Sequence, residues 1–461
     1  MGHIEPYRRR YGRAQGSPSH STQINVQKSA IMFICPPISV LNMKRPLALL
    51  LCLLVMTMSL AGCVGGNDDS LETPEHVVDN LLCIGEIGPG HAWSLNSGDS
   101  PSVVTPIVFN EELYYFADNS ERMEADLWKY NGMNASIVAE IGGWDETGFV
   151  IFNNELYFGA SDEIHGHELW KYDGTTASMV TDIEPGSIGS QPTDLQVYNG
   201  ELYFSAYDAP NGFELWMYDG TNAPSMVANI NPGGNGSHPQ TLTVFNNELY
   251  FGASDGIHGM ELWKYNGTNL SMVVDINPQR IDYEYDWFYN GSFPRIIAVF
   301  NNELYFYGTT DWFNYTGELW KTDGINTSMV DSKVAVYGTV FEGDLILWTD
   351  TGLESYDGIN YSSIFTSHWR DEERAMGISV PIVSNGNLFF GTINENYVQE
   401  LWMYDGTNTS LVATSYNPSI SIDEGMEVPM RRLTQYYDDL YVVVDSQEAF
   451  GGMELCKYSP L

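Results

Sequence analysis

The feature that most constrains the fold is a sequence unit that recurs along most of the chain. Residues 245–276, FNNELYFGASDGIHGMELWKYNGTNLSMVVDI, contain three aromatic and apolar runs, at 248–254, 261–265 and 271–276. Asn-Gly between two such runs is a strong hairpin signal, because both residues tolerate the positive φ angles of a tight turn. Together with TLTVF at 241–245, the unit predicts four short antiparallel strands.

Eight copies of this unit follow one another. Glu354 and Cys456 occupy the third-strand tryptophan position in two copies that otherwise keep the pattern. Four strands in about 45 residues, repeated, are typical of a β-propeller blade. We therefore predict an all-β β-propeller with eight four-stranded blades. The other six copies carry Trp128, Trp170, Trp216, Trp263, Trp320 and Trp402.

The repeated residues resemble the ELW-x-x-DGT repeat family of secreted bacterial and archaeal proteins. The matching segments are ELWKYDGT (168–175), ELWMYDGT (214–221 and 400–407) and ELWKYNGT (261–268). The resemblance covers roughly residues 81 to 458. It implies a propeller architecture and a cell-surface setting, and it supplies no catalytic residues.

The N-terminal region predicts an exported lipoprotein. Residues 1–42 show no periodic pattern, and we interpret them as an unstructured upstream extension. Residues 43–62 contain a basic start and an apolar run that is shorter than the roughly 20 residues of a membrane-spanning helix. The run ends in Leu-Ala-Gly before Cys63, which is a lipobox. We expect a lipoprotein signal peptide, lipidation of Cys63 and a lipid-anchored acidic tether over 63–80, with an uncut signal anchor as the alternative.

The charge of the mature chain excludes one class of partner. Removal of residues 1–62 takes away seven of 20 Lys and Arg and one of 60 Asp and Glu, which leaves 13 basic and 59 acidic residues and a net charge of −46. Such a surface repels nucleic acid and anionic lipid headgroups. We expect no nucleic-acid partner, and membrane contact through the lipid anchor only.

The two ends of the propeller domain are expected to meet. No Gly/Ser/Pro-rich linker interrupts the repeats, so residues 81–461 are interpreted as a single domain. The last unit stops after its third strand, and LLCIGEIGPG at 81–90 matches the fourth-strand segment SMVVDINPQ at 271–279. The N-terminal strand would complete the C-terminal blade, and this closure removes the open edge of the ring.

The cysteines support this closure. Cys35 and Cys52 lie in the removed segment and Cys63 takes the lipid, which leaves Cys83 and Cys456. In most units the tryptophan faces a residue nine positions later; Cys456 occupies the tryptophan position and Cys83 that of its partner. Opposed strand residues are close enough for a disulfide after modest adjustment, and such a bond persists outside the cytoplasm. We predict a Cys83–Cys456 disulfide, with two buried free thiols as the alternative.

The long insertions predict where a ligand would bind. Turns in a propeller alternate between two faces, and nearly all length variation falls on the face with the second-to-third and inter-blade connections. These insertions combine aromatic rings with carboxylates, which suits sugars by stacking and hydrogen bonding or cationic peptides by cation–π contact. The alternative is that these side chains cap the blades. The candidate ligand-binding residues are Tyr285, Trp287, Tyr289, Asp311, Trp312, Tyr315 and Trp369.

The repeated residues are interpreted as structural. The Trp and Tyr of each Glu-Leu-Trp-x-Tyr should pack against the next blade, and Asp/Asn-Gly-Thr forms turns. Asp162, His165, Asp255 and His258 lie in separate loops, so we expect no metal site there. No cofactor is expected. Ca²⁺ is left open at the fourth-strand acids Glu86, Glu140, Asp182 and Asp275.

Three functions are compatible with these features. No catalytic motif is present, and paired carboxylates carry no information among 59 acids. We favour a non-catalytic cell-surface binding module whose partner is a glycan or an extracellular protein or peptide. The alternatives are an envelope scaffold lipoprotein that docks membrane proteins, and a polysaccharide lyase or glycoside hydrolase using the central funnel. Nine N-x-S/T sequons permit glycosylation without establishing it: Asn134, Asn235, Asn266, Asn269, Asn290, Asn314, Asn326, Asn360 and Asn408.

Overall fold

A computed structural model shows a ring of antiparallel sheets. The residues that it describes belong to one compact unit, 74–461. Residues 1–80 lie outside the described part of the chain, and with them the expected extension, signal peptide, Cys63 and tether. The described ranges are 81–83, 105–119, 124–143, 148–162, 164–278, 291–311, 316–366, 378–394, 398–416, 431–445 and 453–459.

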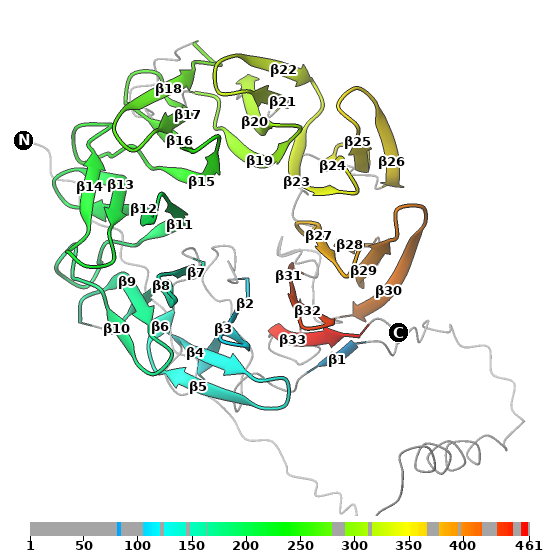
Figure 1. The fold of residues 1–461 in the computed structure, drawn as a ribbon, viewed down its shortest axis with the longest axis horizontal. Coiled ribbons are helices and arrows are strands. Elements are labelled where there is room, and N and C mark those ends of the chain that lie inside the picture. Colours follow the sequence, from blue (N-terminus) through cyan, green and yellow to red (C-terminus); the bar gives the residue numbers. More distant parts are fainter. Residues whose placement is uncertain are drawn as a thin grey trace, which may run out of the picture. The chain divides into compact units, whose positions relative to one another are not determined.

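Eight sheets, here called blades 1 to 8 in chain order, surround a common centre (Figure 1). Blade 1 contains β2 (Ile107–Phe109), β3 (Glu112–Asn119), β4 (Glu124–Tyr130) and β5 (Ala135–Ala139). Blade 2 contains β6 (Gly142–Gly143), β7 (Val150–Phe152), β8 (Glu155–Ser161), β9 (His167–Tyr172) and β10 (Ala177–Met179). Blade 3 contains β11 (Thr193–Tyr198), β12 (Glu201–Asp208), β13 (Gly212–Tyr218) and β14 (Ser225–Ala228). Blade 4 contains β15 (Gln240–Phe245), β16 (Glu248–Ser254), β17 (Met260–Tyr265) and β18 (Leu270–Val274).

The other four blades repeat the pattern. Blade 5 contains β19 (Arg295–Phe300), β20 (Glu303–Asp311), β21 (Thr316–Thr322) and β22 (Thr327–Asp331). Blade 6 contains β23 (Ala335–Phe341), β24 (Asp344–Thr349), β25 (Gly352–Tyr356) and β26 (Tyr361–Thr366). Blade 7 contains β27 (Ile382–Ser384), β28 (Asn387–Ile393), β29 (Val398–Tyr404) and β30 (Thr409–Tyr416). Blade 8 contains β31 (Arg431–Tyr436), β32 (Asp439–Asp445), β33 (Met453–Tyr458) and β1 (Leu81–Cys83).

The predicted eight-bladed propeller is confirmed, with one irregularity. In blade 2 the position of the first strand is shared by two short strands, β6 and β7, which both pair with β8. Every other blade has four strands in simple antiparallel order. Among the described residues no helix is long and apolar enough to cross a membrane.

The ring closes where the ends of the domain meet. β1 pairs antiparallel with β33, and the register sets Leu81 opposite Tyr458 and Cys83 opposite Cys456. Figure 1 shows β1 beside β33 at the edge of blade 8. The predicted completion of the last blade by the N-terminal strand is therefore confirmed at the level of backbone pairing.

The turns between first and second strands are two residues long in all eight blades. Both turn residues have positive φ in seven of these hairpins, for example Asn153-Asn154 (49° and 62°), as a type I′ turn requires, whereas in blade 8 only Tyr437 (54°) does. This conformation explains why asparagine and glycine dominate these positions. The equivalent residues that begin the turns are Asn110, Asn153, Asn199, Asn246, Asn301, Glu342, Asn385 and Tyr437.

Third-strand tyrosines join seven of the blades to the blade before them, whereas blade 5 has Thr322 at this position. Tyr218 of blade 3 packs on Tyr157 of blade 2, with ring centroids 6.0 Å apart. The same contact crosses the seam between the first and last blades, where Tyr130 lies 6.0 Å from Tyr441. Such tilted and edge-on arrangements are the favourable ones for aromatic rings. Closure therefore involves side-chain packing as well as backbone pairing.

The third-strand tryptophans also pack between blades. Trp216 belongs to the same hydrophobic cluster as Val180 and Ile183, which follow the last strand of blade 2. We expected contact with the next blade, whereas the neighbour is the preceding one, because the fourth strand of that blade ends beside the third strand of its successor. The predicted pairing across the hairpin is confirmed for Trp170–Met179, Trp263–Met272, Trp320–Met329 and Trp402–Leu411.

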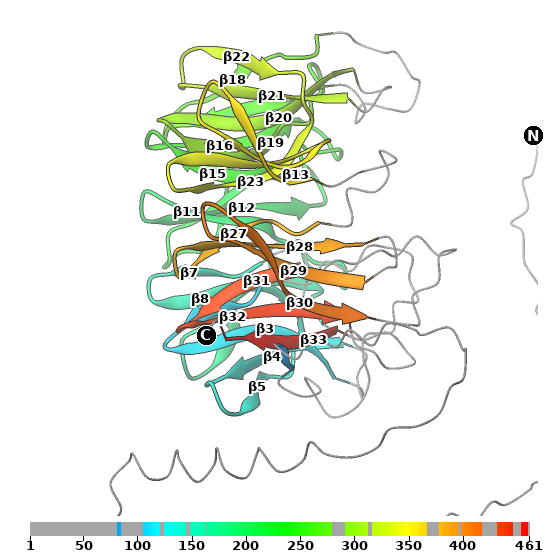
Figure 2. The same ribbon diagram turned by 90° about the vertical axis from the view of Figure 1, so that its right-hand side faces the viewer.

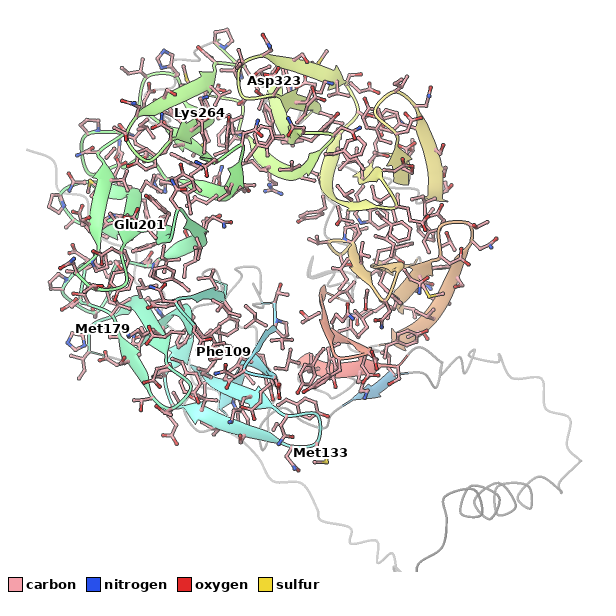
Figure 3. The ribbon with its side chains drawn as sticks, in the orientation of Figure 1. Phe109, Met133, Met179, Glu201, Lys264 and Asp323 are labelled. Carbon is pink, nitrogen blue, oxygen red and sulfur yellow. The ribbon has the colours of Figure 1, made fainter. Side chains whose placement is uncertain are left out.

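The strands run along the axis of the ring, so their connections lie on two opposite faces (Figure 2). We call the face with the first-to-second and third-to-fourth turns the turn face, and the opposite one the loop face. Figure 3 places Phe109 toward the inside of its blade and Met133, in a third-to-fourth turn, at the outer rim.

Candidate functional site

Most of the predicted ligand-binding residues lie outside the described residues. Asp311 is the last residue of β20, and its backbone pairs with Thr316; its side chain is not among those described. The grouping of these residues into one site therefore stays a prediction. The residues outside the described part are Tyr285, Trp287, Tyr289, Trp312, Tyr315 and Trp369.

The strand bounds show that the two faces are unequal. On the turn face, third-to-fourth connections are as short as Tyr172 to Ala177 and Thr322 to Thr327. On the loop face, β18 ends at Val274 and β19 begins only at Arg295. Nearly all variation in connection length thus falls on the loop face, as predicted, although the third-to-fourth connection of blade 3, Tyr218 to Ser225, is also longer than its counterparts.

The lysines neutralise carboxylates mainly near the turn face. Lys171 pairs with Glu155 at 3.0 Å and Lys264 pairs with Glu248 at 2.9 Å, and equivalent pairs occur in blades 1, 5 and 8. Lys333, which follows β22, instead pairs with Glu354 at 2.8 Å. Each lysine among the described side chains is therefore in an ion pair, and five of these six pairs lie near the turn face.

A buried carboxylate anchors each of the three inter-blade connections that join blades 2, 3, 4 and 5. Glu261, in the Glu-Leu-Trp of blade 4, is completely buried. Its Oε2 accepts hydrogen bonds from the Ser292 hydroxyl at 2.6 Å and the Ile276 amide at 3.2 Å, and Oε1 accepts one from the Ser292 amide at 3.1 Å. In this arrangement a third-strand glutamate binds the Gly-Ser pair of the connection that follows its blade. We call it the Gly-Ser clasp.

The clasp recurs in the two preceding blades. Glu214 accepts the Ser237 hydroxyl at 2.6 Å, and Glu168 accepts the Ser190 hydroxyl at 2.5 Å. All three glutamates and their serines are fully buried. Because a buried carboxylate is stable only when its oxygens accept hydrogen bonds, each clasp ties an inter-blade connection to the third strand.

Glycine is required before each clasp serine. Gly291 has a φ of 120°, and a Cβ there would lie 2.3 Å from the Met260 nitrogen. Gly236 has a φ of 66°, with its Cβ position 2.3 Å from the Phe213 nitrogen. Only a residue without a side chain lets the connection approach the third strand so closely.

Burial sets the ionisation of these glutamates. Removal from water raises the pKa of Glu261 to about 7, although the hydrogen bonds from Ser292 and Ile276 act in the opposite direction. Burial also raises the pKa of Glu214 and of Glu168, again against hydrogen bonds from their serines. The inter-blade connections of the loop face are thus held by buried carboxyl groups that are poorly hydrated.

We did not predict the clasp, although the sequence contains a signal for it. Gly-Ser-x-Pro occurs at 189–192, 236–239 and 291–294, each time after a Glu-Leu-Trp unit. The repetition of an invariant serine inside connections of different length would have indicated a shared buried partner.

The second-to-third loops of blades 2 to 4 form local turns. Asp255 Oδ1 accepts the amides of Ile257 and His258, and its Oδ2 contacts His258 Nδ1 at 2.7 Å. Asp162 and His165 repeat this geometry. Within the described ranges no group of three or more His, Cys, Asp or Glu that could hold a metal ion is found.

Comparison of the sequence with known proteins gives no relative. No protein-family model matches the chain, and no curated protein matches it.

Comparison of the structure gives propellers of low identity. The β-propeller domain of the Trilobed protease from Pyrococcus furiosus is 10% identical with a TM-score of 0.42, over 68% of this chain and 99% of that one. A puromycin-hydrolyzing peptidase from Mycobacterium tuberculosis is 10% identical with a TM-score of 0.46, over 79% of this chain and 61% of the peptidase, so the chain spans less than two thirds of it. The BP39L lectin from Burkholderia pseudomallei is 8% identical with a TM-score of 0.39, over 67% of this chain and 93% of the lectin.

Proposed function

We propose that this protein is a lipid-anchored propeller of the cell surface that binds a glycan or an extracellular protein or peptide without catalysis. The observation that supports the proposal most is the difference in connection length between the turn face and the loop face. A turn face built from uniform short hairpins has little capacity to vary, whereas connections can change without disturbing the blades. Binding is therefore assigned to the loop face.

The charge of that face supports a ligand with cationic or hydroxyl groups. Asp182 and Asp275 follow the fourth strands of blades 2 and 4 on the loop face, and both are partly buried. One carboxylate oxygen of each is buried and has no protein hydrogen-bond partner, so contact with a ligand would involve the rest of the partly exposed side chain.

A matched pair of charge variants tests the face. In blade 3 the position of Asp182 is occupied by Asn229, so Asp182→Asn and Asp275→Asn together introduce a residue that this fold already accepts there. The turn-face control is Asp219→Asn with Asp323→Asn, because Asn131 and Asn266 hold the same turns in blades 1 and 4. Both variants lose two negative charges.

Full-length protein in detergent is screened on glycan and peptide arrays. We expect the loop-face pair to weaken binding at least several-fold while the turn-face pair binds normally. Trp287→Ala with Trp312→Ala should abolish the same signal. Loss of binding in the turn-face variant, or no effect of either loop-face change, would contradict the assignment.

A further inference from the structure

Five of the N-x-S/T sequons occupy one structural position. Each asparagine is the fourth residue of a third-to-fourth turn, and its serine lies two residues later in the fourth strand. The turns of blade 1, NGMNAS (131–136), and blade 5, DGINTS (323–328), show the shared arrangement. The five asparagines are Asn134, Asn269, Asn326, Asn360 and Asn408, in blades 1, 4, 5, 6 and 7.

These five sequons are accessible at both functional groups. All five asparagines are exposed, as are the serines that complete the sequons, such as Ser136 and Ser271. Each asparagine immediately precedes the fourth strand and each serine is the second residue of that strand, so both groups lie at the exposed start of the strand. The strands that follow, such as β5 and β18, are the outermost of their blades and have no further strand beside them.

Asn235 provides an internal contrast. Its sequon, Asn235-Gly236-Ser237, also has an exposed asparagine. The hydroxyl of Ser237, however, is fully buried and donates to Glu214 at 2.6 Å in the clasp. In the folded protein this serine cannot be presented to an enzyme.

We propose that the five rim asparagines carry N-linked glycans and that Asn235 does not. The proposal rests on the export proposed above. In the reaction the asparagine Nδ2 forms a bond to the anomeric carbon of a sugar on a lipid-linked oligosaccharide. The bond between that carbon and the lipid phosphate breaks, the phosphate leaves with the electron pair, and the amide loses one proton to a base of the transferase.

The local hydrogen bonds of the five asparagines are compatible with this reaction. Asn326 Nδ2 donates to Asp323 at 3.1 Å and Asn360 Nδ2 donates to Asp357 at 3.3 Å. All four residues are exposed, so water replaces these bonds at little cost. In blades 1 and 4 the turn begins with Asn131 or Asn266 rather than with an aspartate, and no such carboxylate holds the amide.

The position of the glycans predicts their effect. An outermost strand presents unpaired backbone groups that can pair with a second molecule. A sugar at the start of five such strands sterically blocks that pairing. The rim glycans would thus keep the blades from associating edge to edge.

The test is glycopeptide mass spectrometry on protein purified from the surface fraction of its native host. We expect sugar on the peptides that contain the five rim asparagines and none on Asn235. Asn269→Gln and Ser271→Ala should each lower the intact mass by one glycan, whereas Asn235→Gln should not. Blade 2 lacks the sequon because Thr176 occupies its asparagine position before Ala177-Ser178, so Thr176→Asn should add one glycan.

Two outcomes overturn the proposal. Surface-exposed protein without sugar at the rim would reject it while leaving export intact. Equal modification of Asn235 and the rim would show that accessibility in the folded state does not select the sites. Protein that never reaches the surface would instead contradict the proposed localisation.

Discussion

Glu261 binds its partners through both carboxylate oxygens, so its charge affects the connection between blades 4 and 5. Ser292 Oγ also lies 3.5 Å from the Met260 carbonyl oxygen. When Glu261 is protonated, its carboxyl can donate to Ser292 Oγ while the serine hydroxyl turns to Met260. The clasp therefore has an arrangement for either protonation state.

The raised pKa of Glu261 predicts a pH dependence of stability. Folding raises the pKa from 4.5 to about 7, so between these values the folded state holds a proton that the unfolded state has lost. The free energy of unfolding should then fall as pH rises from about 4.5 to 7, by at most about 3 kcal/mol. Glu261→Gln, which mimics the protonated form, should flatten the profile in urea unfolding measured between pH 5 and pH 8.

The control is Glu111→Gln, which removes the same charge from an exposed turn residue. A wild-type slope in Glu261→Gln would contradict the assignment.

The buried role of Glu261 could not be predicted from its surroundings in sequence, because its main partner, Ser292, is far along the chain. The turn residues could be predicted, because the positive φ required at Asn153 and Asn154 is a local property of the turn.

At the scale of elements, the backbone pairing of β1 with β33 places Cys83 where blades 2, 4 and 5 place methionine opposite tryptophan. The register of the hairpins in blades 2, 4 and 5 follows from turn length, whereas β1 and β33 have no connecting turn. For both kinds of pairing, a slip by one residue would move the apolar side chains to the wrong face. This is why strand order and closure could be predicted from repeats alone. The division of the first strand of blade 2 into β6 and β7 could not, because no other unit in the chain shares it.

We predict that Cys83 and Cys456 form a disulfide that stabilises blade 8. Cys456→Ser should lower the melting temperature, and dithiothreitol should lower that of the wild type to a similar value. The stabilisation should lie near the top of the range of about 0–5 kcal/mol, because the closed loop is long. Non-reducing peptide mapping should recover the two cysteines in one species.

A variant with a different side-chain pair at these positions separates the stability contributed by the covalent bond from that contributed by packing. Cys456→Trp with Cys83→Met introduces the pair found at this register in blades 2, 4 and 5. It should fold without any response to dithiothreitol. Alkylation of both cysteines in protein unfolded without reductant would contradict the predicted bond, because buried free thiols become accessible on unfolding.

At the scale of the whole molecule, the repeats predict the ring but not the geometry of a binding site. Repeated segments constrain one another, and eight copies of one hairpin pattern define a blade and its neighbours. The insertions that contain Trp287, Trp312 and Trp369 have no second copy in the chain. Their positions relative to one another depend on contacts that no repeat reveals.

The proposed anchor makes a separate prediction for the whole molecule. Cys63→Ser should remove the acceptor of the lipid, so the protein should move from the membrane fraction to the soluble or secreted fraction. Carbonate extraction followed by immunoblotting measures the change, with Cys52→Ser as the control, because Cys52 lies in the removed segment. Unchanged membrane retention of Cys63→Ser would favour an uncut signal anchor.

The pairing of β1 with β33 also orders the events of biosynthesis. Leu81–Cys83 leave the ribosome before any blade, yet their partners, Met453–Tyr458, are the last strand to be made. Seven blades can form in succession while the first strand waits without a neighbour. The ring can close only when synthesis of the domain is complete. A truncated product would therefore keep an unpaired strand edge that is prone to association with other chains.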